Sequence, residues 1–577
     1  MSIKRKRLIL CCIFLASLIS VWWGLSVNNA FVYDDTTIIA ENSLKSYGEL
    51  FSFYPTSIYL DRPIRNIITK AMYDLFGTDY VQYHAAEILV HLLNTALLYL
   101  ITKDIFAVKF GEKDDRVFIG AATAVAFFGI WFKSHMAVIW ISGINDLFGT
   151  TFVFLSTIFF LRSRQNPQYV AQNMLLSVFF FYLAIRTKEM FYTLPFLFVL
   201  YDLWRALEEK KKFRLSKGTL VNLLVMAIFF AGILLCKLQD KFLTTDPSNP
   251  YYQSFYPVDL VTSLLRYCMM LFDLKHGGFS YYQISLSGLI GVSVVVLGLI
   301  AAIVLAIRKK VFSLLFCYFA IGFSIITVLP LVNQLHVLYL YFPSAIMGLL
   351  LACVLVKLPA KRTTALCLAI LVCFAAGNSQ ANTSFINDWF KTCKMENNTW
   401  KDLGRIDKPI ENSTIYVRLE NADSYSPFFY GPGSVSRLYW RDMSLKTVLL
   451  RADEEVSYTE PYAVWYCYEN GHVDELERNM QRKAPVILSV YPQVLTVTKQ
   501  MTAEKSGINI GIVVDNINHI QAAMVNGEEK RIFYGDDFVS TSIPYEMLVG
   551  KDSVSIQLID KFGLISEVWN MQVLHQE

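Results

Sequence analysis

Long apolar runs recur over the first two thirds of the chain, and they constrain its fold more than any other feature. The 577 residues are 54% hydrophobic but only 17% charged, and the mean hydropathy is +0.39. Soluble domains carry about 25% charged residues, so the composition predicts a membrane protein. Several runs are shorter than the roughly 20 residues that span the ~30 Å hydrocarbon core. We expect about eleven spans, at 7–27, 84–102, 117–133, 145–161, 172–186, 190–204, 219–236, 285–307, 311–332, 337–356 and 363–378.

The basic residues test this topology independently. Lys4, Arg5, Lys6 and Arg7 precede the first span and should remain in the cytoplasm. Every second connection after that is also basic, at 103–116, 162–164, 210–214, 308–310 and 357–362. This alternation predicts a cytoplasmic N-terminus and places the loop 28–83 and everything after 378 outside. The net charge of +4 mostly reflects this bias, and it gives no support for nucleic-acid binding.

The two long outer loops carry helical patterns. Segments 46–53 and 65–76 place apolar residues at helical spacing, which is typical of helices on a membrane surface. The second loop, 237–284, is amphipathic over 258–274. Together these loops are expected to cover a cavity.

The composition changes after residue 378, where hydrophobic runs shrink to strand length. Strand-like runs occur at 486–497, 508–514, 519–525, 531–534, 554–558 and 568–574, and Asn526-Gly527 predicts a hairpin. We therefore expect a β-sandwich-like module at 485–577. Region 379–484 is expected to be mixed α/β, with strands at 413–419 and 446–450 and a helix at 473–482. The first domain is expected to span 1–378.

The adjacent carboxylates Asp34 and Asp35 follow the first span directly. Charged groups beside a membrane are costly unless water, a cation or a substrate meets them. One interpretation is a general base with its partner, or a pair of metal ligands. The alternative is a solvated turn that starts the loop.

Polar residues inside the second span form one helical face. His84, Glu87, His91 and Asn94 are spaced i, i+3, i+7 and i+10. Such residues face either a substrate cavity or a neighbouring helix. The alternative to a cavity is a structural seam that joins helices.

Charged residues also cluster at the outer ends of later spans. Asp146 opens the fourth span, and Arg186, Lys188 and Glu189 lie between two apolar runs. A pair of cations there suits a phosphate group. The alternative is a connector whose charged ends reach the interface.

With these residues in view, the chain resembles integral-membrane glycosyltransferases of the GT-C class, in particular the O-mannosyltransferase-like family that carries tetratricopeptide repeats in animals, and its bacterial relatives. The resemblance covers about 10–205 well and 255–350 loosely. Its motifs are matched in order by Phe31–Asp35 with Asn42, Arg62-Pro63-Ile64, Tyr83-His84 with His91 and Asn94, Val138 with Trp140–Gly143 and Asp146-Leu147, and Lys188-Glu189 with Thr193-Leu194-Pro195 and Tyr201-Asp202.

Some positions depart from the family pattern. Met136 stands where the family has Glu, Ile144 where it has Arg, and Glu87 where it has Asn. The tetratricopeptide repeats are missing, and the strand-rich region replaces them. The change at Met136 bears on the acceptor chemistry and on activity itself, and the missing repeats bear on a protein acceptor.

The resemblance implies transfer of a monosaccharide from a polyprenyl-phosphate carrier, with inversion, to a glycan, lipid or protein on the outer face. Asp34 would act as general base, and Asp35 would orient the acceptor or hold an ion. Lys188 and Arg186, with Arg62 behind them, would bind the donor phosphate. No cofactor is implied, and a divalent cation is left open. A prokaryotic plasma membrane is expected.

Two other classes of protein remain open. The first is a non-catalytic scaffold, or a protein that binds the lipid carrier and presents its outer domain. The second is a transporter, although the sequence shows neither an inverted repeat nor matching broken helices.

Overall fold

The computed structural model describes residues 23–576 with gaps. The gaps are 25–26, 28, 33, 56–61, 166, 240–251, 273–285, 310, 358–393, 395–396, 421–427, 429–433, 443, 455–457, 459, 480–483, 516, 518–519, 536 and 561–562. The chain divides into two compact units, Met1–Asn397 and Asn398–Glu577. The expected span 363–378 and nearly all of 7–27 lie outside the described residues.

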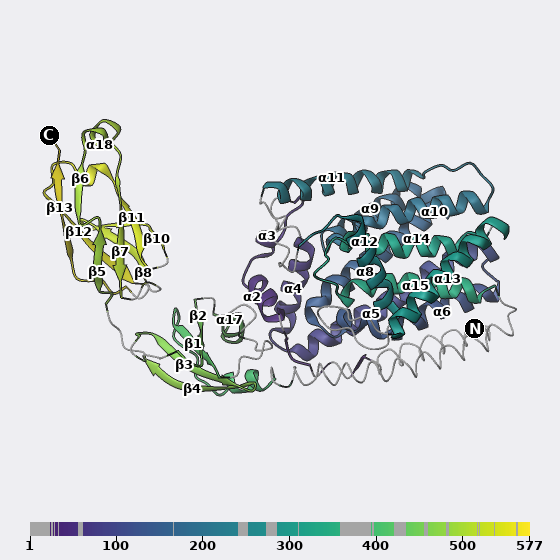
Figure 1. Cartoon of the computed structure of the whole chain (residues 1–577), viewed down its shortest axis with the longest axis horizontal. Coiled ribbons are helices and arrows are strands. Elements are labelled where there is room, and N and C mark those ends of the chain that lie inside the picture. The colour runs from purple at the N-terminus through teal and green to yellow at the C-terminus, as the bar shows by residue number, and fades with distance from the viewer. Residues whose placement is uncertain are drawn as a thin grey trace. The chain divides into compact units, whose positions relative to one another are not determined.

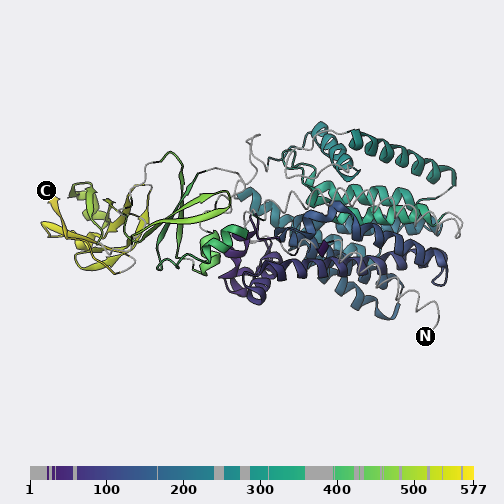
Figure 2. The same cartoon turned by 90° about the horizontal axis from the view of Figure 1, so that it is seen from below.

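The first unit is a bundle of helices that run roughly side by side (Figure 1, Figure 2). Where they are described, the other expected spans coincide with helices. The bundle helices are α5 (Tyr80–Phe110), α6 (Asp115–Ile130), α8 (Ile144–Gln165), α9 (Val170–Ile185), α10 (Leu194–Glu208), α11 (Lys217–Gln239), α12 (Pro257–Phe272), α13 (Leu286–Lys309), α14 (Ser313–Ile325) and α15 (Tyr341–Leu355).

Length and composition qualify several of these helices as membrane spans. Among the described residues, five helical stretches are long and apolar enough to cross a membrane: Tyr80–Phe110, Ile141–Gln165, Lys217–Cys236, Gly288–Lys309 and Val337–Leu355. Shorter apolar helices lie at Val170–Ile185 and Ser313–Val328. The unit is therefore the multi-pass helical membrane domain that the hydropathy predicts.

Close packing in the bundle depends on small residues. A Cβ atom added at Gly348 of α15 would lie 2.6 Å from the carbonyl oxygen of Ala124 in α6. The two helix backbones can approach this closely because position 348 has no side chain.

Helix α13 packs much less closely. Only 17% of its most apolar stretch is buried, so most of this helix is left to face lipid.

Short helices of the loop 28–83 lie at one end of the bundle (Figure 1). They are α2 (Asp35–Ser43), α3 (Tyr47–Leu50) and α4 (Pro63–Phe76). Helix α3 begins with a capping box between Ser46 and Glu49, and α4 begins at a proline. The predicted helices at 46–53 and 65–76 correspond to α3 and α4, and 258–274 corresponds to α12. Helix α2 was not predicted.

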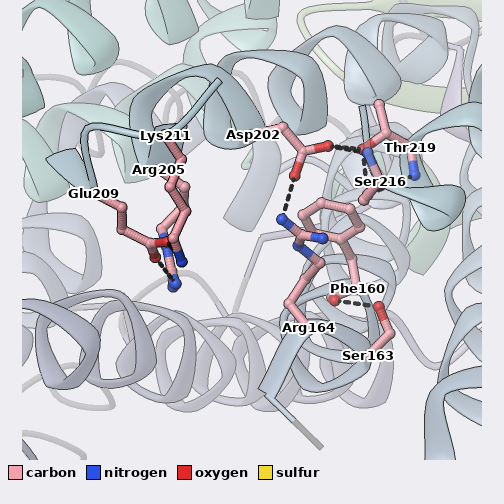
Figure 3. Close-up of polar contacts among 9 residues, drawn as sticks. All are labelled: Phe160, Ser163, Arg164, Asp202, Arg205, Glu209, Lys211, Ser216 and Thr219. Atoms are coloured by element: carbon pink, nitrogen blue, oxygen red, sulfur yellow. Dashed lines mark hydrogen bonds and ion pairs between the residues drawn. The ribbon is translucent and has the colours of Figure 1, made fainter. Parts of the chain in front are cut away.

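The other end of the bundle is held by a buried carboxylate, Asp202 of α10 (Figure 3). It accepts hydrogen bonds from the Ser216 backbone N–H (2.8 Å) and the Thr219 hydroxyl (2.6 Å), at the start of α11. The guanidinium of Arg164, at the end of α8, lies 3.3 Å away. Asp202, part of the Tyr201-Asp202 motif noted in the sequence, therefore joins α8, α10 and α11.

The second unit begins with a four-stranded mixed sheet of order β2-β1-β3-β4. Its elements are β1 (Thr414–Leu419), α17 (Ser434–Trp440), β2 (Lys446–Arg451), β3 (Ala463–Glu469) and β4 (His472–Asn479). Strand β1 pairs in parallel with both β2 and β3, and β4 pairs antiparallel with β3. The predicted strands at 413–419 and 446–450 are present.

The predicted helix at 473–482 is wrong, because its described part forms strand β4. Residues Asn470 and Gly471 have φ angles of 52° and 87°, which form a tight hairpin turn after β3. The pairing that this turn sets up with β3 outweighs the helix-favouring Glu, Leu and Arg residues of the segment.

The C-terminal module contains two sheets, of order β10-β11-β7-β5 and β6-β13-β12-β8-β9. Both contribute side chains to one apolar core, so this region is β-rich as expected. The elements are β5 (Ile487–Tyr491), β6 (Val494–Val497), α18 (Lys499–Glu504), β7 (Ile508–Val514), β8 (Ile520–Val525), β9 (Glu528–Lys530), β10 (Ile532–Tyr534), β11 (Val539–Ile543), β12 (Ser553–Asp560) and β13 (Trp569–His575).

Two details of this module bear on the predictions. The Asn526-Gly527 hairpin joins β8 to β9, with φ angles of 49° and 82°, as expected. The single strand expected at 486–497 is two strands that belong to different sheets. Pro492 lies between them and has no N–H to offer a strand ladder, so β5 ends there.

Candidate active site

Asp35 joins the loop 28–83 to the start of α8. Its Oδ1 accepts hydrogen bonds from the backbone N–H (2.8 Å) and the hydroxyl (2.5 Å) of Ser142. Its Oδ2 accepts a hydrogen bond from the Val32 N–H at 2.9 Å. Burial, together with the neighbouring charge of Asp34, raises the pKa of Asp35 well above its ordinary value. Both carboxylate oxygens are thus engaged in holding the loop.

Asp34 is placed differently from its neighbour. It occupies the N-cap position of α2, and its side chain makes no capping hydrogen bond. Its Oδ1 is buried and accepts no hydrogen bond within the described part of the chain. Burial raises the pKa of Asp34, while Ser142 and the positive charge of Arg65 act in the opposite direction. Of the two carboxylates, only Asp34 therefore keeps an oxygen without a described hydrogen bond.

Asp146 and Lys188 form a buried ion pair between α8 and the connection that precedes α10. The Nζ of Lys188 lies 2.6 Å from Oδ2 of Asp146, and the two side chains are 7% and 1% exposed. The same ammonium lies 4.7 Å from the centre of the Tyr339 ring, a cation–π distance. Lys188 is therefore fixed by a charge on one side and a ring on another.

Arg62 and Glu189 form a second ion pair at this end. The guanidinium donates two hydrogen bonds, of 2.9 Å from Nε and 2.7 Å from an Nη atom, to the two carboxylate oxygens. The side chains are 30% and 28% exposed, so solvent reaches this pair. The positive charge of Arg62 also attracts the Asp146 carboxylate and repels the Lys188 ammonium. The two ion pairs therefore form one charged cluster.

The side chain of Arg186 is not open to solvent or to a described cavity. Its side chain is fully buried, and an Nη atom donates a hydrogen bond to the Ser52 carbonyl oxygen at 3.0 Å. Its own carbonyl oxygen accepts a hydrogen bond from the Ile64 N–H at 3.2 Å. These contacts attach the loop 28–83 to the end of α9.

The polar face of α5 is occupied by contacts to neighbouring segments. Nδ1 of His84 lies 2.9 Å from Oε2 of Glu87, and Nε2 of His84 lies 3.0 Å from the Asn29 carbonyl oxygen. His91 lies 2.8 Å from the Tyr341 hydroxyl and 3.1 Å from the Gly129 carbonyl oxygen. All three side chains are buried, in an arrangement that fits the structural-seam interpretation.

Several residues of this end were not singled out from the sequence. Ser142 was noted only within a motif, and Arg65 only within a helix. His336 stacks on Trp140, with ring centroids 6.0 Å apart, and burial lowers its pKa to about 3. Arg65 could have been found from its position one helical turn after Arg62. His336 carries no sequence signal beyond its place before the last described span.

The space beside Asp35 is small. A cavity of about 10 Å³ is lined by Asp35, Arg65, Tyr83, Ser142 and Asn145, among others. This is about the room that one water requires. Within the described ranges, no group of three or more His, Cys, Asp or Glu side chains is arranged to hold a metal ion.

The fold and this site define an integral, multi-pass helical membrane protein with a charged cluster at one end of its bundle and a C-terminal β-rich region. No family model and no curated protein match the chain. Among solved structures, the apo crystal structure of ArnT from Cupriavidus metallidurans is similar, with 16% identity and a TM-score of 0.32, over 77% of this chain and 86% of that chain. A similarity at this TM-score carries no inference about the activity of this chain.

Proposed function

We propose that the chain is a membrane glycosyltransferase that moves a monosaccharide from a polyprenyl phosphate to an acceptor at its outer face. The motif resemblance to the GT-C class motivates this proposal. The observation that carries it is the buried Oδ1 of Asp34, which accepts no described hydrogen bond. This carboxylate lies at the same end of the bundle as Arg65 and the ion pairs of Arg62 and Lys188.

In the proposed reaction, the Asp34 carboxylate takes the proton of an acceptor hydroxyl. The acceptor oxygen forms a bond to the anomeric carbon as the bond from that carbon to the phosphate oxygen breaks. The electron pair leaves with the phosphate, and the configuration inverts. A raised pKa makes Asp34 a stronger base than an ordinary aspartate, which favours this step.

Cations stabilise the charge that develops on the leaving phosphate. Lys188 and Arg62 are the candidates, and each would exchange part of its present carboxylate contact for phosphate oxygens. Arg62 already donates in the two-pronged geometry that phosphate accepts. Asp35 is a positioning residue in this proposal, because its hydrogen bonds hold Ser142. Arg186 is assigned to holding the loop.

A second candidate is a non-catalytic protein that binds the lipid carrier. Two observations favour it: Lys188 and Arg62 are both already neutralised by carboxylates, and the cavity beside Asp35 has room for about one water. The replacements at Met136 and Ile144 point in the same direction.

Turnover separates the two candidates. The purified protein is incubated with radiolabelled polyprenyl-phosphate sugars, and both hydrolysis and transfer are measured. We expect the native chain to turn over and Asp34→Asn to lose at least about a hundredfold in activity. The control variant Glu41→Gln changes an exposed carboxylate on the same helix and should keep full activity. Donor binding without turnover in the native chain supports the second candidate, and full activity of Asp34→Asn refutes the base assignment.

A further inference from the structure

A larger cavity lies at the end of the bundle opposite the candidate active site. Its volume is about 240 Å³, and it is bounded by the C-terminal ends of α5 and α15 and the N-terminal ends of α6 and α14. The candidate site, in contrast, lies near the N-terminal ends of α5 and α8. The basic connections predict that the cavity opens at the cytoplasmic face.

The charged residues in the wall of this cavity are all cations: Lys109, Arg116 and Lys357, each at the end of a different helix. Lys109 is paired with Glu208 at 2.9 Å, and Arg116 with Asp114 at 2.7 Å. In the described ranges, Lys357 makes no ion pair. Three positive and two negative charges leave a net charge of +1 at the mouth.

Apart from its cations, this cavity is lined mostly by apolar side chains, and a second cavity lies beside it. A second, apolar cavity of about 90 Å³ shares Ile105, Phe316 and Leu349 as walls with the first. The two cavities adjoin at these three side chains, between α5, α14 and α15, and the pair with its cationic mouth is called the apolar path below. Water gains little in such a path, because its lining offers few polar partners.

We propose that this path binds one phospholipid of the cytoplasmic leaflet. The phosphodiester would lie at Lys357, Lys109 and Arg116, and one acyl chain would occupy the apolar path. A lipid with a single net negative charge, such as phosphatidylglycerol, complements the net charge of +1. Basic residues at the cytoplasmic ends of membrane helices attract anionic lipids for the same electrostatic reason. This inference does not depend on the proposed glycosyl transfer.

The test is lipid-dependent thermal unfolding of the whole protein after removal of bound lipid in detergent. We expect phosphatidylglycerol to raise the melting temperature saturably, and phosphatidylethanolamine or inorganic phosphate to do so much less. Lys357→Glu should raise the half-saturating phosphatidylglycerol concentration about tenfold or more. Lys212→Glu, the same charge change at an exposed position outside the cavity, should leave it unchanged.

A second variant tests the apolar path. Leu349→Trp should reduce lipid retention measured by native mass spectrometry, and if that variant does not fold, Ile105→Phe serves the same purpose. An equal response to inorganic phosphate overturns the lipid assignment, and an equal response to phosphatidylethanolamine overturns the charge argument. Asp34→Asn should retain the phosphatidylglycerol response, and its loss there would place the lipid at the other end of the bundle.

Discussion

The carboxylate of Asp35 accepts two hydrogen bonds from Ser142, a residue 107 positions later in the chain. This contact joins the loop 28–83 to the start of α8. It also distinguishes two adjacent carboxylates, because Asp35 is occupied by donors while Asp34 keeps a buried oxygen without a described partner.

Asp35→Ala should destabilise the protein more than Ser142→Ala. The first change leaves the N–H groups of Val32 and Ser142 without their acceptor, at a cost of about 1–3 kcal/mol for each buried group. The second removes only the hydroxyl contact. Thermal unfolding in detergent measures both, and the double variant should be no less stable than Asp35→Ala. Full additivity of the two losses would contradict the shared contact.

Arg65→Ala should move the acid limb of the pH–activity profile to higher pH. The base must be deprotonated, so activity rises with pH through the pKa of Asp34, which burial has raised. Arg65 favours the carboxylate, so its removal raises this pKa further. The profile of kcat/KM reports the shift, with Lys212→Ala as the control. A shift to lower pH would be incompatible with this electrostatic role.

Breaking the Asp146–Lys188 pair from one side should cost about 3–5 kcal/mol, because the remaining charge is buried without its partner. Asp146→Asn and Lys188→Gln should each lower the unfolding temperature strongly. The double variant should lose less than the sum of the two. A sum equal to the two single losses would mean that the residues stabilise the fold independently.

Gly348→Val should separate α15 from α6. The added side chain meets the Ala124 carbonyl oxygen, a backbone atom that cannot turn away. Overpacking of this kind costs about 1–3 kcal/mol. Gly322→Val on α14 is the matched control, because a Cβ at Gly322 meets no atom within 4 Å. Comparable melting temperatures for the two variants would disprove the close approach.

Gly471→Ala should destabilise the sheet of the second unit. Its φ of 87° is unfavourable for a residue with a side chain, by about 1 kcal/mol or more. Asn470→Gly should be tolerated, because glycine adopts the φ of 52° at that position without strain. Limited proteolysis of the two variants compares them. Equal protease resistance would argue against a strained turn at Gly471.

Hydropathy and spacing predicted much of the architecture. The positions of the described bundle helices, α4 and α12 followed from apolar periodicity, and the Asn526-Gly527 hairpin followed from turn chemistry. Where prediction failed, pairing outweighed propensity: β4 became a strand because Asn470-Gly471 folds it onto β3. The roles of His84, Glu87 and His91 stayed open between cavity and seam, because periodicity shows which residues share a face and not what that face meets.

The sequence by itself determined that this protein crosses the membrane as a helical bundle and carries a strand-rich region, because apolar runs must satisfy their backbone hydrogen bonds within lipid. It also placed the acidic pair at an end of the bundle. Only the tertiary structure decided which carboxylate is occupied, which cations are neutralised and where the apolar path runs. Those properties depend on donors and walls contributed by distant segments, and no local pattern records the distance between them.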